Sequence, residues 1–176
     1  MSPLYIATLA VATHDVRRQV REQGGNNRGP DVERVLRNAG VTIPAPWCAA
    51  WVQDVTDSAA QSLGVTNPLN DVVNEALVQS YANWAAQKPK DRLVIFPSRA
   101  LPGDLVLYKF GTSGRYDHVG IVSRPPFDDA GGALFRSFEA NTSSGDAGSQ
   151  RDGHGVYERV RSVAPGKTMF VRWACS

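Results

Sequence analysis

The sequence has little of several residue patterns that mark specialised protein classes. It contains no stretch near the roughly 18 consecutive apolar residues that a membrane-spanning helix needs, so we expect no membrane insertion. Its 19 basic and 17 acidic residues leave a formal net charge of +2, which is too small to indicate nucleic acid as a partner. It has only two cysteines, Cys48 and Cys175, which could form one disulfide or remain two free thiols.

The composition that remains is that of a soluble globular protein, and we expect a monomer with a single domain over residues 1–176. Hydrophobic residues make up 42% and charged residues 20% of the chain, which suits one packed core. The chain shows no internal repeat and no low-complexity linker. The apolar segment 4–12 lacks the basic region that opens a secretory signal, so we expect no signal peptide.

The order of the predicted elements indicates an α+β fold. Apolar spacing, proline positions and turn residues predict helices over residues 14–23, 30–38, 46–60 and 70–87. The last of these helices has an apolar stripe made of Val73, Leu77, Tyr81 and Trp84. Short segments rich in Val, Phe and Tyr predict strands over residues 104–110, 118–123, 133–139, 155–162 and 168–173. Helices followed by strands favour N-terminal helices packed on a mainly antiparallel sheet of about five strands.

Cys48 is the candidate nucleophile. Pro44 and Pro46 suit the approach and first turn of a helix, which places Cys48 at the helix start. There the free backbone N–H groups and the positive end of the helix dipole favour a thiolate and can also bind an oxyanion. The alternative is a buried structural cysteine, because free cysteine is among the most buried residue types.

His118 is the candidate base, and Glu139 is the candidate for orienting it. If strands 118–123 and 133–139 form a hairpin across the turn-rich segment 124–132, paired residue numbers add up to 257, and His118 faces Glu139. Asn141 would join them on the same face, because side chains two apart on a strand share a face. Asp117 points to the other face and is a weaker candidate. The alternative is that His118 is an ordinary polar residue at a strand start.

These segments together resemble a known family, the CHAP amidases (cysteine, histidine-dependent amidohydrolases and peptidases), which are close to the NlpC/P60 peptidoglycan hydrolases. The resemblance covers about residues 29–173 and is closest to CHAP domains of phage and prophage lysins. It rests on Pro46-Trp47-Cys48-Ala49-Ala50-Trp51-Val52, Leu101-Pro102-Gly103-Asp104-Leu105-Val106, Asp117-His118-Val119-Gly120-Ile121-Val122, Phe138-Glu139-Ala140-Asn141-Thr142 and the glycine-rich run 145–157.

The resemblance implies a papain-like fold and hydrolysis of an amide bond in peptidoglycan. Cys48, His118, Glu139 and Asn141 would be nucleophile, base, orienting residue and supporting polar residue. Some relatives bind calcium through aspartates around the cysteine, whereas residues 41–52 contain no acidic side chain, so we expect no metal and no other cofactor.

Two aromatic residues are candidates for substrate binding. Trp47 directly precedes the nucleophile, and Tyr116 lies in the loop before the base. Trp51, four residues after Trp47, is expected to lie in the core.

Other functions fit the same residues. The chain could be a papain-like protease or an acyltransferase that acts on a protein, or an inactive module that binds the cell wall without cutting it. A wall hydrolase without a signal peptide would reach its substrate by phage lysis, on a phage particle or through a secretion machine. An inhibitor protein could accompany it.

Overall fold

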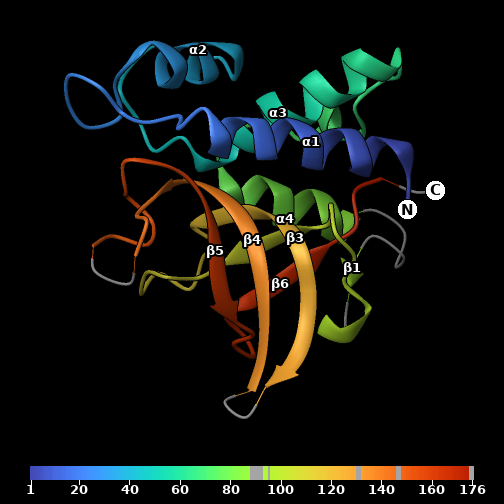
Figure 1. The fold of residues 1–176 in the computed structure, drawn as a ribbon. Helices are drawn as coiled ribbons and strands as arrows, with labels where there is room; N and C mark the ends of the chain where they lie inside the picture. Colours follow the sequence, from blue (N-terminus) through green and yellow to red (C-terminus); the bar gives the residue numbers. More distant parts are fainter. Residues whose placement is uncertain (88–92, 95, 130–131, 146–147, 175–176) are drawn as a thin grey trace.

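The computed structural model describes residues 1–87, 93–94, 96–129, 132–145 and 148–174. Within them the chain is α+β, as predicted (Figure 1). The helices are α1 (Pro3–Arg17), α2 (Pro30–Asn38), α3 (Cys48–Leu63) and α4 (Val78–Gln87), with short 3-10 turns at η1 (Pro68–Asp71) and η3 (Pro97–Arg99). The strands are β1 (Leu93–Val94), β2 (Leu105–Tyr108), β3 (His118–Asp129), β4 (Gly132–Thr142), β5 (Gly155–Ser162) and β6 (Thr168–Val171).

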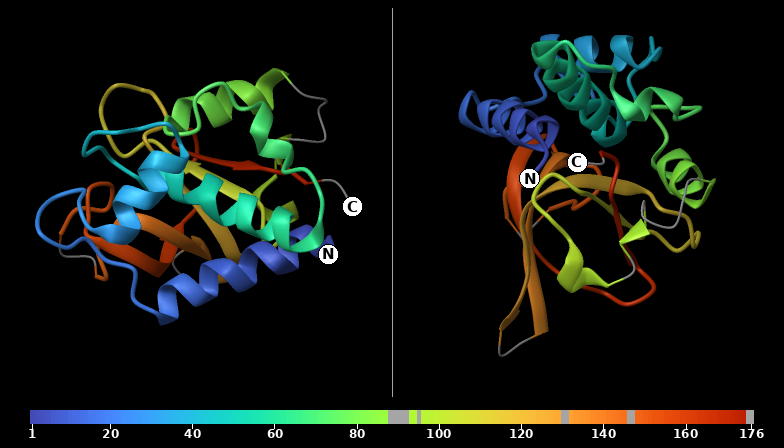
Figure 2. Two further views of the ribbon diagram at one scale, coloured as in Figure 1. Left: turned by 90° about the horizontal axis from the view of Figure 1, so that it is seen from above. Right: turned by 90° about the vertical axis from the view of Figure 1, so that its right-hand side faces the viewer.

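The strands form one antiparallel sheet in the order β1-β6-β2-β3-β4-β5. The five strands from β2 to β6 are those predicted from the sequence, and the two-residue β1 adds a short edge. Figures 1 and 2 show α1, α2 and α3 gathered on one side of this sheet, while the β3–β4 hairpin extends away from them. Among the described helices, none combines the length and apolar character needed to cross a bilayer.

Helix α3 is the central helix of the fold, and this position fixes the start of the helix against the sheet. It contacts α1 and α2 of the helical layer and β3 and β4 of the sheet. Trp51 has no exposed surface, and its Nε1 donates a hydrogen bond to Asp15 of α1 at 2.9 Å. Its predicted core position is therefore confirmed.

The first predicted helix was misplaced. The expected range was 14–23, whereas α1 spans Pro3–Arg17 and buries Leu4, Tyr5 and Ala12. The apolar segment 4–12 is thus a core-facing helix. Gln19 adopts a left-handed backbone with φ of 57°, which ends the helical path soon after Arg17.

The fourth predicted helix is only half present, because α4 begins at Val78 instead of near residue 70. The Asn67 side chain accepts a hydrogen bond from the Leu69 N–H at 3.0 Å, and Asn74 does the same for Ala76 at 3.2 Å. Such local bonds compete with a helix. Of the predicted stripe, Tyr81 and Trp84 are buried, whereas Val73 is 99% and Leu77 51% exposed.

Candidate active site

Cys48 is the first residue of α3, and Trp47 is its N-cap residue. The Cys48 side chain is a free thiol with only 3% exposure. The Trp51 N–H bonds to the Trp47 carbonyl at 2.9 Å, so the N–H groups before it have no acceptor within the helix. The thiol therefore lies beside backbone N–H groups that have no acceptor within α3, as the sequence predicted. Cys175 lies outside the described residues.

Asn141 holds the start of this helix. Its Oδ1 accepts a hydrogen bond from the Trp47 N–H at 3.2 Å, and its Nδ2 donates to the Gly153 carbonyl at 2.8 Å. Asn141 lies inside β4 but has a φ of 56°, at the point where the β4–β5 register is interrupted. We expected Asn141 beside the imidazole, but the structure places it against the backbone of Trp47, the residue before Cys48. It supports Cys48 instead of His118.

His118 and Glu139 form the buried pair that the sequence proposed. His118 Nε2 lies 2.9 Å from Glu139 Oε2, and neither side chain is exposed. The register behind this pair differs from the prediction, because Glu139 pairs with Gly120, and 120 + 139 gives 259 instead of 257. The strands extend into the segment 124–132 that was expected to be a turn, with irregular pairing around Arg124 and Phe127 that includes two prolines. A shift of two residues keeps the same face, so the contact survives.

Gly120 makes room for Glu139. A Cβ atom at Gly120 would lie 2.7 Å from Glu139 Cγ and 2.8 Å from the Phe138 carbonyl oxygen. Because Gly120 has no side chain, the Glu139 carboxylate can reach over β3 and bond to His118.

Three further residues, which the sequence reading missed, fix the Glu139 carboxylate. Its Oε1 accepts hydrogen bonds from Tyr108 Oη at 2.9 Å, Ser137 Oγ at 2.6 Å and Arg161 Nε at 2.9 Å. Arg161 also donates through Nη2 to Oε2. One signal could have identified Arg161, because an arginine inside a predicted strand requires a carboxylate partner if its side chain is buried.

The network keeps Glu139 ionised. Burial alone would raise the pKa of its carboxyl group, but hydrogen bonds from Arg161 and His118 outweigh burial and lower it to about 2. At neutral pH the carboxylate can only accept hydrogen bonds, so His118 Nε2 must carry a hydrogen. The other ring nitrogen, Nδ1, is then the one that can exchange a proton with a nucleophile.

The pKa of His118 is raised above its ordinary value. Burial is the largest influence and lowers the pKa of the imidazole, but interactions with Cys48 and Glu139 outweigh it and raise the pKa to about 9. Since Nε2 is bonded to Glu139, the interaction with Cys48 must involve Nδ1. In the described part of the chain Nδ1 is buried and has no hydrogen bond of regular geometry. Nδ1 is therefore the ring nitrogen that is available to the Cys48 thiol.

Asp117, the weaker candidate, does not contact the imidazole. Its carboxylate accepts hydrogen bonds from the N–H groups of Phe110 at 2.8 Å and Gly111 at 2.7 Å. The Tyr116 N–H bonds to Gln79 Oε1 of α4 at 3.0 Å. Asp117 therefore closes the loop between β2 and β3, and Tyr116 ties this loop to the helical layer.

A pocket of about 400 Å³ opens beside Cys48. Tyr116 lines it, which makes its predicted substrate contact geometrically feasible. Trp47 does not line it: the side chain is fully buried, and its Nε1 donates to Glu22 Oε1 at 3.0 Å. The prediction that Trp47 contacts the substrate is therefore wrong for this conformation. The lining residues are Ala45, Pro46, Cys48, Ala76, Leu77, Val78, Gln79, Ser113, Arg115, Tyr116, Asp117, Arg151 and Asp152.

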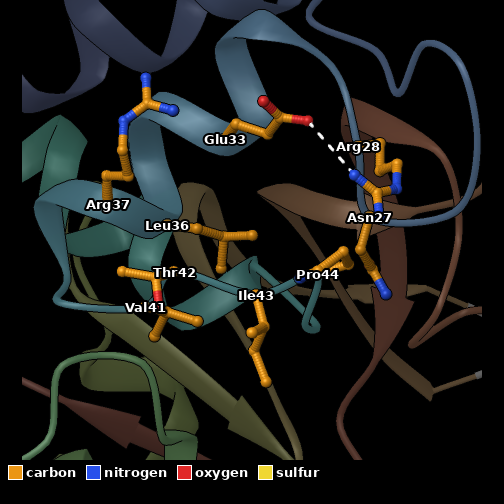
Figure 3. A pocket seen from close by; sticks show the side chains of 9 residues that line it. All are labelled: Asn27, Arg28, Glu33, Leu36, Arg37, Val41, Thr42, Ile43 and Pro44. Carbon is orange, nitrogen blue, oxygen red and sulfur yellow. Dashed lines mark ion pairs between the residues drawn. The ribbon is translucent and has the colours of Figure 1, made fainter.

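A second pocket, of about 170 Å³, lies against α2 and segment 41–44 (Figure 3). Arg28 and Glu33 form an ion pair of 4.0 Å at its edge, and Arg37 lies on the opposite side from Arg28. None of the residues that line this pocket belongs to the Cys48–His118–Glu139 group. Within the described ranges, no three His, Cys, Asp or Glu side chains are grouped so that they could hold a metal ion.

Comparison with known proteins adds no relative, since no family model, no curated protein and no solved structure matches the chain. The function is therefore argued from the site alone. A thiol at a helix start, a buried imidazole and an orienting carboxylate are the parts needed for acyl transfer through a covalent intermediate.

Proposed function

We propose that this protein is a papain-like cysteine hydrolase of the CHAP and NlpC/P60 kind, which cuts an amide bond in bacterial peptidoglycan. The observation that carries the proposal is the buried His118–Glu139 pair at 2.9 Å. Because Nε2 is bonded to Glu139, the Nδ1 atom of His118 is available to Cys48 at the start of α3. A structural role alone does not require a charged imidazole next to a free thiol at the edge of a pocket.

In the first half of the reaction, His118 holds the proton that Cys48 gives up, and the thiolate attacks the scissile carbonyl carbon. The unpaired N–H groups at the start of α3 stabilise the oxyanion that forms. The C–N bond then breaks, and His118 Nδ1 donates its proton to the leaving amine. Cys48 remains as an acyl-enzyme.

In the second half of the reaction His118 must act as a base in its neutral form, which requires a lower pKa. Acylation of Cys48 lowers this pKa. The interaction with Cys48 is one cause of the raised pKa of His118. An acylated sulfur carries no charge, so the pKa falls once the thioester has formed. Neutral His118 then removes a proton from water, which attacks the thioester and releases the acid product.

Peptidoglycan as substrate is supported by the resemblance of the chain to wall amidases. The bond would lie either between the sugar lactyl group and L-alanine or within the peptide. Action on the wall would follow delivery by phage lysis, a phage particle or a secretion machine.

The test is incubation of purified peptidoglycan with the wild-type protein and with Cys48→Ala, followed by mass analysis of the released fragments. We expect Cys48-dependent fragments with a new amine and a new carboxyl end, and no fragments from the variant. Cys175→Ser is the matched control and should remain active. Release of fragments by a folded Cys48→Ala variant would contradict the mechanism, and binding without release would indicate a wall-binding module.

A further inference from the structure

Four charged side chains line the pocket beside Cys48, and three of them form one ion-pair group in which a single arginine lies between two aspartates. Arg151 bonds to Asp152 through Nη2 at 2.8 Å and Nε at 3.0 Å, and its Nη1 lies 3.7 Å from Asp117. Asp117 additionally accepts two backbone hydrogen bonds. The fourth charge, Arg115, has no side-chain partner among the described residues, although it lines the same pocket.

The loop that carries Arg115 is held at both of its ends. Asp117 binds the N–H groups of Phe110 and Gly111, where the loop begins, and the Tyr116 N–H is bonded to Gln79 at the other end. Gly114 precedes Arg115 with a φ of 73°, which suits a tight turn without a side chain. The guanidinium is therefore presented from a fixed backbone, which lowers the entropy lost when a ligand binds.

The rest of the pocket wall is largely apolar, with Pro46, Leu77, Val78 and Tyr116 among its lining residues. Such a pocket suits a peptide residue with an aliphatic body, and a free guanidinium suits a planar carboxylate, to which arginine can donate two parallel hydrogen bonds. Neither aspartate is bonded to Arg115: Asp152 is bonded to Arg151, and Asp117 accepts two backbone hydrogen bonds and lies 3.7 Å from Arg151.

We infer that Arg115 is a specificity-determining residue that selects substrates with a free carboxylate on a residue next to the scissile amide. This inference rests on the proposed function and names the substrate class of the same site. A substrate whose carboxylate has been converted to a carboxamide presents one donor and one acceptor to a group that only donates. The enzyme should therefore discriminate against amidated wall peptides.

The experiment compares two synthetic stem-type muropeptides that differ only in this group, one as free acid and one as carboxamide. For the wild-type protein, kcat/KM should be about 10- to 100-fold higher on the free acid, the range of a hydrogen bond to a charged group. In Arg115→Gln the acid-to-amide ratio should fall towards one, whereas Arg115→Lys should keep part of it. Arg37→Gln, which removes an exposed arginine of the pocket in Figure 3, controls for the change in net charge and should keep the wild-type ratio.

Two results separate this inference from the proposed function. Cys48-dependent cleavage with equal rates on acid and amide, or an Arg115→Gln variant that keeps the wild-type ratio, would overturn the inference and leave the function intact. If neither peptide is cleaved, the proposed function fails, and calorimetric titration of Cys48→Ala with both peptides decides the inference. Tighter binding of the acid that is lost on adding Arg115→Gln supports it, and its absence overturns it.

Discussion

Replacement of Glu139 by glutamine should damage both stability and catalysis, and the structure allows the two effects to be separated. The carboxylate accepts hydrogen bonds from Tyr108, Ser137, Arg161 and His118 and has no exposed surface. The variant leaves Arg161 without a counter-ion in a buried position. Removing one partner of a buried ion pair costs about 3–5 kcal/mol of unfolding free energy. For a domain of this size, that corresponds to a melting temperature lower by about 6–20 °C.

The stability loss should depend on pH in a defined way. The pKa of Glu139 is lowered to about 2, so the stabilisation by its carboxylate is fully present above the unfolded value of 4.5 and is lost as the pH falls through about 2. His118 behaves in the opposite sense: its stabilising effect is fully present below 6.5 and is lost as the pH rises through about 9. The difference in melting temperature between wild type and Glu139→Gln should therefore be largest between pH 4.5 and 6.5 and shrink towards pH 2.

The catalytic effect follows from His118. Without the carboxylate, the pKa of the imidazole falls from about 9, and either ring nitrogen can carry the hydrogen. We expect initial rates on purified peptidoglycan to fall about 10²- to 10⁴-fold, the usual contribution of a positioned acid–base group. The alkaline limb of the rate profile, near pH 9 in the wild type, should move to lower pH.

The matched control is Glu158→Gln on the neighbouring strand. Glu158 accepts a hydrogen bond from Ser123 at 2.7 Å and pairs with Arg136 at 3.3 Å, but its side chain is 35% exposed. Its loss should change stability by about 1 kcal/mol or less and leave the pH profile as it is. Rates, circular dichroism and melting curves at each pH provide the measurement. A Glu139→Gln variant with wild-type rate and an unchanged alkaline limb would refute the assigned role.

Two further predictions use the same assays. Asn141→Ala removes the hydrogen bond that holds the Trp47 N–H, so it should lower stability by about 1–2 kcal/mol and reduce the rate less than Glu139→Gln does, without moving the alkaline limb; a shifted limb would show that Asn141 acts on the imidazole after all. EDTA should leave the rate on purified walls unchanged, because segment 41–52 offers no acidic ligand; inactivation that calcium reverses would show that ligands come from elsewhere.

Local sequence signals were sufficient to predict that Cys48 lies at a helix start and that His118 meets Glu139. The prolines before Cys48 locate a helix start, and alternation along the strands puts Glu139 on the His118 face even though the pairing register is displaced by two. The fold class also follows from local patterns, because helical periodicity precedes strand periodicity along the chain.

Other features depend on contacts that local patterns do not encode. Asn67 and Asn74 replace the first part of the expected fourth helix with side-chain-capped turns. Asn141 adopts a positive φ inside β4, which redirects its amide from the imidazole to the start of α3. Arg161 reaches Glu139 across neighbouring strands, a contact that requires knowledge of the β4–β5 pairing. The first error therefore arises from local side-chain bonds that compete with a helix, and the other two arise where tertiary contacts override local preference.

The division of the site between two layers has a further consequence. The nucleophile belongs to the helical layer, whereas His118 and Glu139 belong to the sheet, and the Asn141–Trp47 hydrogen bond is a direct link between them. Neither layer contains the whole Cys48–His118–Glu139 group. The geometry of this group is a property of the interface between the layers, so under the proposed function we expect any ligand or partner that shifts α3 relative to β3 and β4 to change activity without touching Cys48, His118 or Glu139.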